Sequence, residues 1–438
     1  MQNWLKSKIN FLNKSLKDIQ THEIIFLYFV YITFIIFLSL IFTYLFVHKF
    51  EYISDNNNQL ILKNIPFGYG ELINNLFYDH SYVQKYHGNV DFYLARLPFL
   101  PIFSTLILKI STNIYYFLLI KNLILFTFLF IITILSLRNR KIFDLIFILL
   151  LFSFIPYNLQ TQLNFWFADS YTSILVPTLF IAILSEGRNK FFFITIIIII
   201  LYLIKTSMFF LTFILVISLL LIEKKEKKIG KYFLIIGYLL AIFSWGTFGY
   251  IKTGKFPFGS KLSSINSEAL SISFNKSFHK YYPLKSVDSI DYVRIQEDDF
   301  ENEWEYYEYY TKRNKKYLKE NIDQVFLDSL LKMKFILFNI RRDAVFPNKA
   351  GIVDNPIMYS HVMNRLFFII SLLVLVHSFV RGFKDKDFEK IDVYFFLIVF
   401  GSIFLHIIAW ATSKHLVGIF IISYIYLYFK IKNKFLKI

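Results

Sequence analysis

The chain has 438 residues, of which 56% are hydrophobic and 20% aromatic, and its mean hydropathy is +0.50. Its long apolar runs match the ~20 residues that cross a bilayer, which excludes an ordinary soluble enzyme and predicts an all-α polytopic membrane protein. The net charge of +17 needs no nucleic acid as a partner, because the basic residues flank the apolar runs, where they meet anionic membrane lipids. Since the chain has no cysteine, it has no disulfide, no thiolate metal ligand and no cysteine nucleophile.

In chain order, ten apolar segments with basic flanks are predicted to span the membrane as helices. They cover residues 24–47, 115–137, 142–156, 171–184, 191–204, 208–222, 232–250, 366–380, 393–411 and 416–429. The polar start of the chain and the absence of a small-residue cleavage site predict an uncleaved signal anchor. Lys and Arg concentrate in alternate connections, so both termini are expected in the cytoplasm and the protein in the cell inner (plasma) membrane.

The first long connection, residues 48–114, is expected on the extracytoplasmic face as part of an N-terminal membrane module at residues 1–250. Helical spacing predicts a helix over Tyr69–Tyr78. The apolar stretch Leu97–Ile110 begins with two prolines, which favours a re-entrant or interfacial helix.

The second long connection, residues 251–363, is predicted to form a large extracytoplasmic loop before the C-terminal membrane helices at 364–438. It begins with a Ser-rich stretch at 260–273 that is expected to be irregular. A helix is expected from Lys312 to about Ile340.

Four carboxylates in the outer connections are candidate catalytic acids or bases: Glu71, Asp79, Asp91 and Asp169. Asp169 stands where a predicted span begins, and as an alternative to catalysis it is expected to be the N-cap of that helix. Glu71 and Asp79 also fit the solvated face of a surface helix, and Asp91 fits a turn.

Basic side chains in the same connections are candidates to bind a phosphorylated lipid. Lys205 interrupts two apolar runs and either binds phosphate or snorkels to the lipid surface as an anchor. The full candidate set is Arg96, Lys205, Arg341, Arg342, Lys414, His415 and His80. No metal site is predicted, and the chain contains no P-loop, no GxGxxG and no HExxH motif.

The order of these parts resembles the polyprenyl-phosphate-dependent membrane glycosyltransferases of the GT-C class, including the protein mannosyltransferase and aminoarabinose transferase branch. The resemblance rests on Tyr69-Gly-Glu-Leu-Ile-Asn-Asn-Leu76 after the first span and on Arg96-Leu-Pro-Phe-Leu-Pro101 before the re-entrant helix. Where the family has an acid four residues before the first-loop tyrosine, this chain has Ile65. The general base is therefore reassigned to Glu71, Asp79 or Asp91.

The resemblance implies an inverting transfer of a sugar from a polyprenyl-phosphate donor to an acceptor hydroxyl on a lipid, glycan or protein. In such a reaction a first-loop carboxylate takes the acceptor proton and Asp169 orients the acceptor or shares the basic role. Arg96, Lys205 or the Arg341–Arg342 pair neutralises the lipid phosphate. No organic cofactor is implied, and a divalent cation is left open.

Two other functions remain as alternatives. An O-antigen polymerase or ligase also combines about ten spans with a large outer loop, and in it the chemistry would depend on Arg341 and Arg342. A transporter of lipid-linked glycans would place polar groups and broken helices near the membrane midplane.

Overall fold

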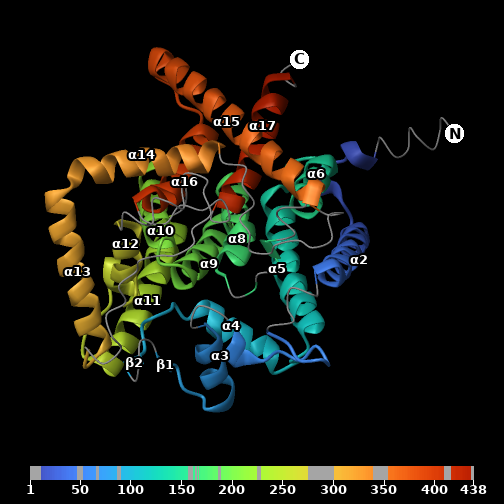
Figure 1. Cartoon of the computed structure of the whole chain (residues 1–438). Coiled ribbons are helices and arrows are strands. Elements are labelled where there is room, and N and C mark those ends of the chain that lie inside the picture. Colours follow the sequence, from blue (N-terminus) through green and yellow to red (C-terminus); the bar gives the residue numbers. More distant parts are fainter. Residues whose placement is uncertain are drawn as a thin grey trace.

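The computed structural model describes residues 11–46, 53–65, 69–85, 90–155, 161–162, 165, 167–185, 189–223, 228–274, 300–338, 354–408 and 416–435. This part of the chain is largely helical (Figure 1). Its one sheet is a pair of antiparallel two-residue strands, β1 (Gln84–Lys85) and β2 (Asp91–Phe92). The all-α prediction is confirmed.

Each of the ten predicted spans contains a helix. They are α2 (Thr21–Phe46), α5 (Ile114–Ser136), α6 (Ile142–Phe154), α8 (Asp169–Ile183), α9 (Lys190–Ile204), α10 (Met208–Ile222), α11 (Lys228–Thr253), α15 (Asp354–Asp385), α16 (Lys390–Ile408) and α17 (Val417–Phe435). Within the described ranges, α2, α5, α11 and α15 are long and apolar enough to cross a membrane. At 1.5 Å per residue, the 15 residues of α8, α9 and α10 reach only about 22 Å, which is less than a typical hydrocarbon core. The number of crossings therefore stays a prediction.

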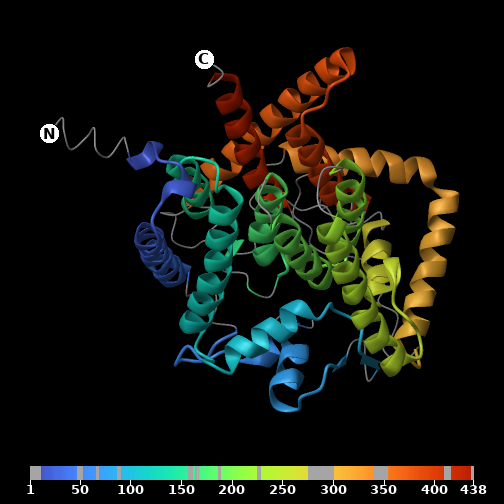
Figure 2. The same ribbon diagram turned by 180° about the vertical axis from the view of Figure 1, so that it is seen from behind.

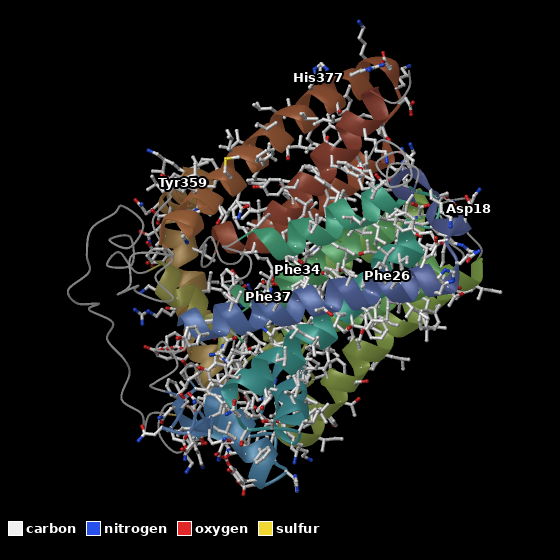
Figure 3. The ribbon with its side chains drawn as sticks, turned by 90° about the vertical axis from the view of Figure 1, so that its right-hand side faces the viewer. Asp18, Phe26, Phe34, Phe37, Tyr359 and His377 are labelled. Atoms are coloured by element: carbon white, nitrogen blue, oxygen red, sulfur yellow. The ribbon has the colours of Figure 1, made fainter. Side chains whose placement is uncertain are left out.

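Peripheral and central helices differ in what they bury. α2 presents large apolar side chains outward, including Phe26 (65% exposed) and Phe37 (60% exposed), as Figure 3 shows. α8 is buried along its whole length and packs against α5, α9 and α17. Its Ser and Thr residues allow neighbours to approach closely, and a Cβ atom at Gly418 of α17 would lie 3.0 Å from the Thr172 carbonyl oxygen. An apolar exterior around a helix rich in small residues is typical of a membrane bundle.

At one end of the bundle, which we call the basic end, buried carboxylates bind lysine and tyrosine side chains of neighbouring helices. Asp392 at the start of α16 accepts from Tyr426 (2.6 Å) and Lys430 (3.0 Å) of α17. Asp144 of α6 binds Tyr428 and Lys432 of the same helix. A third carboxylate, Glu223 after α10, binds lysines from α9 and α16. The amino-terminal turn η1 (Leu16–Asp18) joins this end through Leu16 N, which donates to Arg140 O (2.8 Å).

Helices of the first long connection lie at the opposite end, at the bottom of Figure 1, which we call the loop end. They are η3 (Leu62–Asn64), α3 (Tyr69–Tyr78) and α4 (Phe99–Leu108). The prediction of a helix over Tyr69–Tyr78 is confirmed, and α4 lies within the predicted Leu97–Ile110. α4 packs on α3, α5 and α9, so this connection is docked on the bundle.

The second long connection differs from its prediction in two ways. The Ser-rich stretch is ordered, because η4 (Gly259–Leu262) packs on α12 (Asn266–Phe274) and α12 packs on α13 (Glu303–Glu320). The single helix expected from Lys312 is instead two, α13 and α14 (Ile322–Phe338), which Figure 1 shows meeting at a sharp bend. Asn321 makes the break: it leaves helical geometry and its side-chain amide donates to Tyr317 O (3.1 Å).

Close packing at Gly70 gives a first prediction. A Cβ atom there would lie 2.3 Å from the Leu62 carbonyl oxygen and 2.5 Å from that of Ile65, and both are backbone atoms that cannot rotate away. Gly70→Ala is therefore expected to displace α3 from η3 and to cost about 1–3 kcal/mol, measured as thermal unfolding in detergent. Gly230→Ala is the control, because its Cβ would meet the Phe191 side chain at 3.0 Å. Equal stability of the two variants would contradict this packing.

Candidate functional site

Three of the predicted site residues meet at the loop end. Lys205, which follows the last residue of α9, places Nζ 2.7 Å from Oδ1 of Asp169, the first residue of α8. The Asp169 side chain is 3% exposed and that of Lys205 is 16% exposed. The ion pair joins two antiparallel helices at the end of the bundle where the first long connection packs.

Asp169 does not cap α8. The N-cap residue is Ala168, and Asp169 is the first helical residue with its carboxylate on Lys205. The alternative that Asp169 is an N-cap is therefore wrong. The structure also differs from the snorkelling alternative for Lys205, because its ammonium group binds the buried Asp169 carboxylate.

Arg96 and Tyr69 complete a group with this ion pair. The Arg96 guanidinium lies over the Tyr69 ring, 4.8 Å from its centroid. Burial raises the pKa of Tyr69, while Arg96 lowers it and the negative charge of Asp169 raises it further. Tyr69 therefore lies within electrostatic range of both Arg96 and Asp169. We call Tyr69, Arg96, Asp169 and Lys205 the Asp169 cluster.

The backbone that carries Arg96 is fixed from several sides. Tyr82 Oη donates to Arg96 O (2.8 Å), and Ser263 Oγ donates to Ala95 O (2.6 Å). Ser264 N donates to Leu94 O (2.9 Å). The two long connections therefore cooperate to place one arginine.

Glu303, at the start of α13, binds the backbone of the same segment just before Arg96. Its carboxylate accepts from Leu94 N (3.0 Å) and Tyr93 N (3.3 Å), and the residue is 2% exposed. Asn302 caps α13 by accepting from Trp304 N, which fixes where Glu303 points. Sequence reasoning missed Glu303 because its partners lie 209 residues away.

Glu303 leads to a second prediction, on pH. Burial raises the pKa of Glu303 above that of a free glutamate, so the folded protein holds its proton more tightly than the unfolded chain. Its contribution to stability is full below the unfolded pKa of about 4.3 and is lost as pH rises through the raised folded pKa. Glu303→Gln, which keeps an uncharged acceptor, is expected to remove this fall in a comparison of thermal unfolding at pH 4 to 7. An identical pH profile in both proteins would contradict it.

The first-loop carboxylates take other places. Glu71 accepts from Lys85 N (2.8 Å), and Asp91 pairs with Lys85 Nζ (2.7 Å) with both side chains about half exposed. Asp79 is exposed at the end of α3, and exposed His80 follows it with φ of +53° in the left-handed region that ends many helices. These contacts shape the loop. Arg341, Arg342, Lys414 and His415 lie outside the described residues.

A buried lysine near the Asp169 cluster was also missed. Lys121 in α5 is fully buried, donates to Gln162 O, and lies 5.5 Å from the ring centroid of Tyr171, whose own ring packs edge-on against Phe103 of α4. A lysine inside an apolar segment is a signal of function that the sequence did contain.

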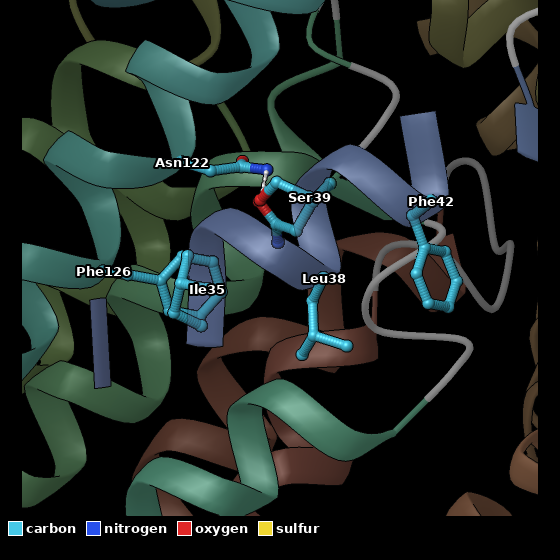
Figure 4. Close-up of a pocket in the computed structure, with 7 residues that line it drawn as sticks. Ile35, Leu38, Ser39, Phe42, Asn122 and Phe126 are labelled. Atoms are coloured by element: carbon cyan, nitrogen blue, oxygen red, sulfur yellow. Dashed lines mark hydrogen bonds between the residues drawn. The ribbon is translucent and has the colours of Figure 1, made fainter. Parts of the chain in front are cut away.

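A small pocket lies beside Lys121, between α2 and α5 (Figure 4). In it Asn122 Nδ2 donates to Ser39 Oγ (3.1 Å), while Asn122 Oδ1 and Gln162 Oε1 are buried with no partner among the described residues. Its cavity volume of about 10 Å³ holds roughly one water molecule, so it does not accommodate a sugar.

The arrangement supplies one buried carboxylate paired with a lysine, and beside it a phenol that lies under an arginine. Among the described residues, no three His, Asp or Glu side chains gather as a metal site. Comparisons with protein-family models, with curated proteins and with solved structures give no match.

Proposed function

We propose that the protein is an integral-membrane glycosyltransferase that moves a sugar from a polyprenyl-phosphate donor to an acceptor hydroxyl on the extracytoplasmic face. The observation that carries the proposal is the Asp169 cluster, in which buried Asp169 binds Lys205. Tyr69, which lies under the Arg96 guanidinium, is within electrostatic range of Asp169. Transfer of a sugar from a polyprenyl phosphate requires two functions, a proton acceptor for the attacking hydroxyl and a cation for the departing phosphate.

In the proposed reaction the acceptor oxygen attacks the anomeric carbon, and the bond between that carbon and the phosphate oxygen breaks. Asp169 takes the acceptor proton, while Arg96 and Lys205 stabilise the charge that collects on the lipid phosphate. Lys205 has a double role, since the arriving phosphate competes with Asp169 for its ammonium group and frees the carboxylate to act as a base. Glu71 and Asp91 then stabilise the first loop through their contacts with Lys85, and Asp169 replaces the first-loop acids as the proposed base.

The membrane arrangement belongs to the same proposal. The basic end would face the cytoplasm, as the positive-inside rule favours for the lysines gathered there, and the loop end would face outward. The ten helices of the predicted spans would cross the membrane, and the short α8 to α10 would do so because their protein neighbours shield them and the bilayer thins locally. The GT-C resemblance of the sequence agrees with this arrangement.

The proposal is tested with purified protein in lipid vesicles and a panel of radiolabelled polyprenyl-phosphate sugars, with an extract of cell-envelope lipids, glycans and proteins as acceptors. We expect one donor to release its label to an acceptor and to leave free polyprenyl phosphate. Consumption of lipid-pyrophosphate oligosaccharides in place of every monophosphate donor would overturn the proposal and favour the polymerase or ligase. Movement of an intact donor across the vesicle membrane without turnover would favour a transporter.

A further inference from the structure

The described side chains of α14, residues 322–334, are arranged inside out for a helix in an aqueous loop. The side chains that face the protein include Asp328 (4% exposed) and Lys332 (2% exposed), one helical turn apart. The side chains that face away are mostly apolar: Ile322, Phe326, Leu327, Leu330, Leu331 and Met333 are 40% to 63% exposed. A water-soluble amphipathic helix has the opposite arrangement.

The inward charges are held by the protein. Gln324 Nε2 donates to Asp328 Oδ1 (2.8 Å), and Asp328 lies close enough to Lys332 and to Tyr317 of α13 to act on both electrostatically. α14 packs against α13, α15 and α16. The polar side of the helix therefore already has its partners, and the apolar side is the one left to be covered.

A neighbour of α14 also exposes apolar side chains. α16 is a predicted span, and Phe396, Phe400 and Phe404 form a row along it with ring centroids 5.8 Å and 5.3 Å apart. Each of these rings is 37% to 40% exposed, as befits a surface in contact with lipid. The exposed charges of α14, Asp323 and Lys334, stand near the two ends of its described side chains, where they can reach lipid head groups.

We propose that α14 lies in the membrane, with Phe326, Leu327, Leu330 and Leu331 in contact with the acyl chains of bilayer lipids. Part of the predicted extracytoplasmic loop is then embedded in the membrane at the edge of the bundle. Its apolar side faces lipid, and its Asp328 and Lys332 side chains face the protein interior. The inference depends on the protein being in a membrane and not on the transferase reaction.

The absence of cysteine makes the test direct, because any introduced cysteine is unique. Leu327→Cys and Leu330→Cys carry a nitroxide label in lipid vesicles, and spin relaxation by oxygen is compared with relaxation by a water-soluble nickel chelate. Leu373→Cys on α15 (65% exposed) is the lipid control, and Tyr309→Cys on α13 (42% exposed) is the water control. We expect both α14 labels to favour oxygen over nickel several-fold, as Leu373→Cys does.

Relaxation of both α14 labels by nickel, as at Tyr309→Cys, would overturn the proposal. A second copy of the chain is the other occupant to exclude. The test is whether Leu330→Cys labels on different molecules give a dipolar distance that persists as the protein is diluted in lipid. Such a distance would mean that a protein surface covers α14, and it would also overturn the proposal. If either variant does not fold, Phe326→Cys and Leu331→Cys place the label on the same face.

Discussion

Asp169→Asn is expected to lower the rate of sugar transfer about 10²- to 10⁴-fold, because the amide keeps the shape of the side chain and cannot accept the acceptor proton. The affinity for the donor is expected to change less, since Arg96 and Lys205 stay in place. The measurement is the initial rate of transfer at several donor concentrations, which separates kcat from KM. Asp18→Asn is the control, because Asp18 is an exposed acid at the basic end (Figure 3).

Loss of fold has to be separated from loss of chemistry in this variant. Removing the Asp169 charge leaves Lys205 without that carboxylate, and breaking one side of a buried pair can cost about 3–5 kcal/mol. Asp169→Asn/Lys205→Met removes both charges and is expected to unfold close to the wild-type temperature while staying inactive. A folded Asp169→Asn that transfers sugar at the wild-type rate, with a large loss in Asp79→Asn or Asp91→Asn, would return the base to the first loop.

Glu223→Gln is expected to destabilise the fold by about 3–5 kcal/mol. The Glu223 carboxylate binds Lys190 (3.1 Å), Lys390 (2.9 Å) and Tyr394 Oη (3.0 Å), and both Glu223 and Lys190 have side chains that are 4% exposed. The substitution leaves the buried ammonium group of Lys190 uncompensated. Thermal unfolding in detergent measures the loss, and Asp385→Asn is the control, since its exposed pair with Arg381 is worth at most about 0.5 kcal/mol.

The pH dependence at Glu223 has the opposite sign to that at Glu303. Burial raises its pKa, but Lys390, Lys190 and Tyr394 together lower it by more, so the net pKa is below the usual value. The stability from this group is present above the unfolded pKa of about 4.3 and is lost as pH falls through the folded pKa. Adding Lys190→Met to Glu223→Gln is expected to restore thermal stability, because it removes the ammonium group that was left uncompensated. Equal losses of stability in Glu223→Gln and Asp385→Asn would contradict the buried ion pair.

Local sequence signals predicted much of the fold. The helix Tyr69–Tyr78 and the ten apolar helices follow from spacing and hydropathy, which act within one or two turns. The bend at Asn321 was missed because good helix formers stand on both sides, and the break is one residue that leaves helical geometry while its backbone N–H and side-chain amide both donate to Tyr317 O. Order in the Ser-rich stretch was missed because it comes from packing on α13, which no local signal contains.

The site was predicted in part for the same reason. Alternation of the spans places Asp169 and Lys205 at the same end of the bundle, but their pairing depends on how α8 and α9 rotate against each other. Composition does not rank the four candidate acids, whereas burial does: Asp169 is enclosed and paired with Lys205, and Asp91 is about half exposed on a strand. The contact of Glu303 with residues 93 and 94 joins the two long connections and depends on the whole fold.

A double-mutant cycle on sugar transfer most directly tests whether the Asp169 cluster is the reaction site. Initial rates are measured with one polyprenyl-phosphate donor for the wild type, Asp169→Asn, Lys205→Met and the double variant, each checked for folding. Because the two groups act as a pair, we expect the double variant to lose no more activity than the worse single variant. Single losses that multiply in the double variant, or folded variants that all transfer sugar at the wild-type rate, would contradict a shared site.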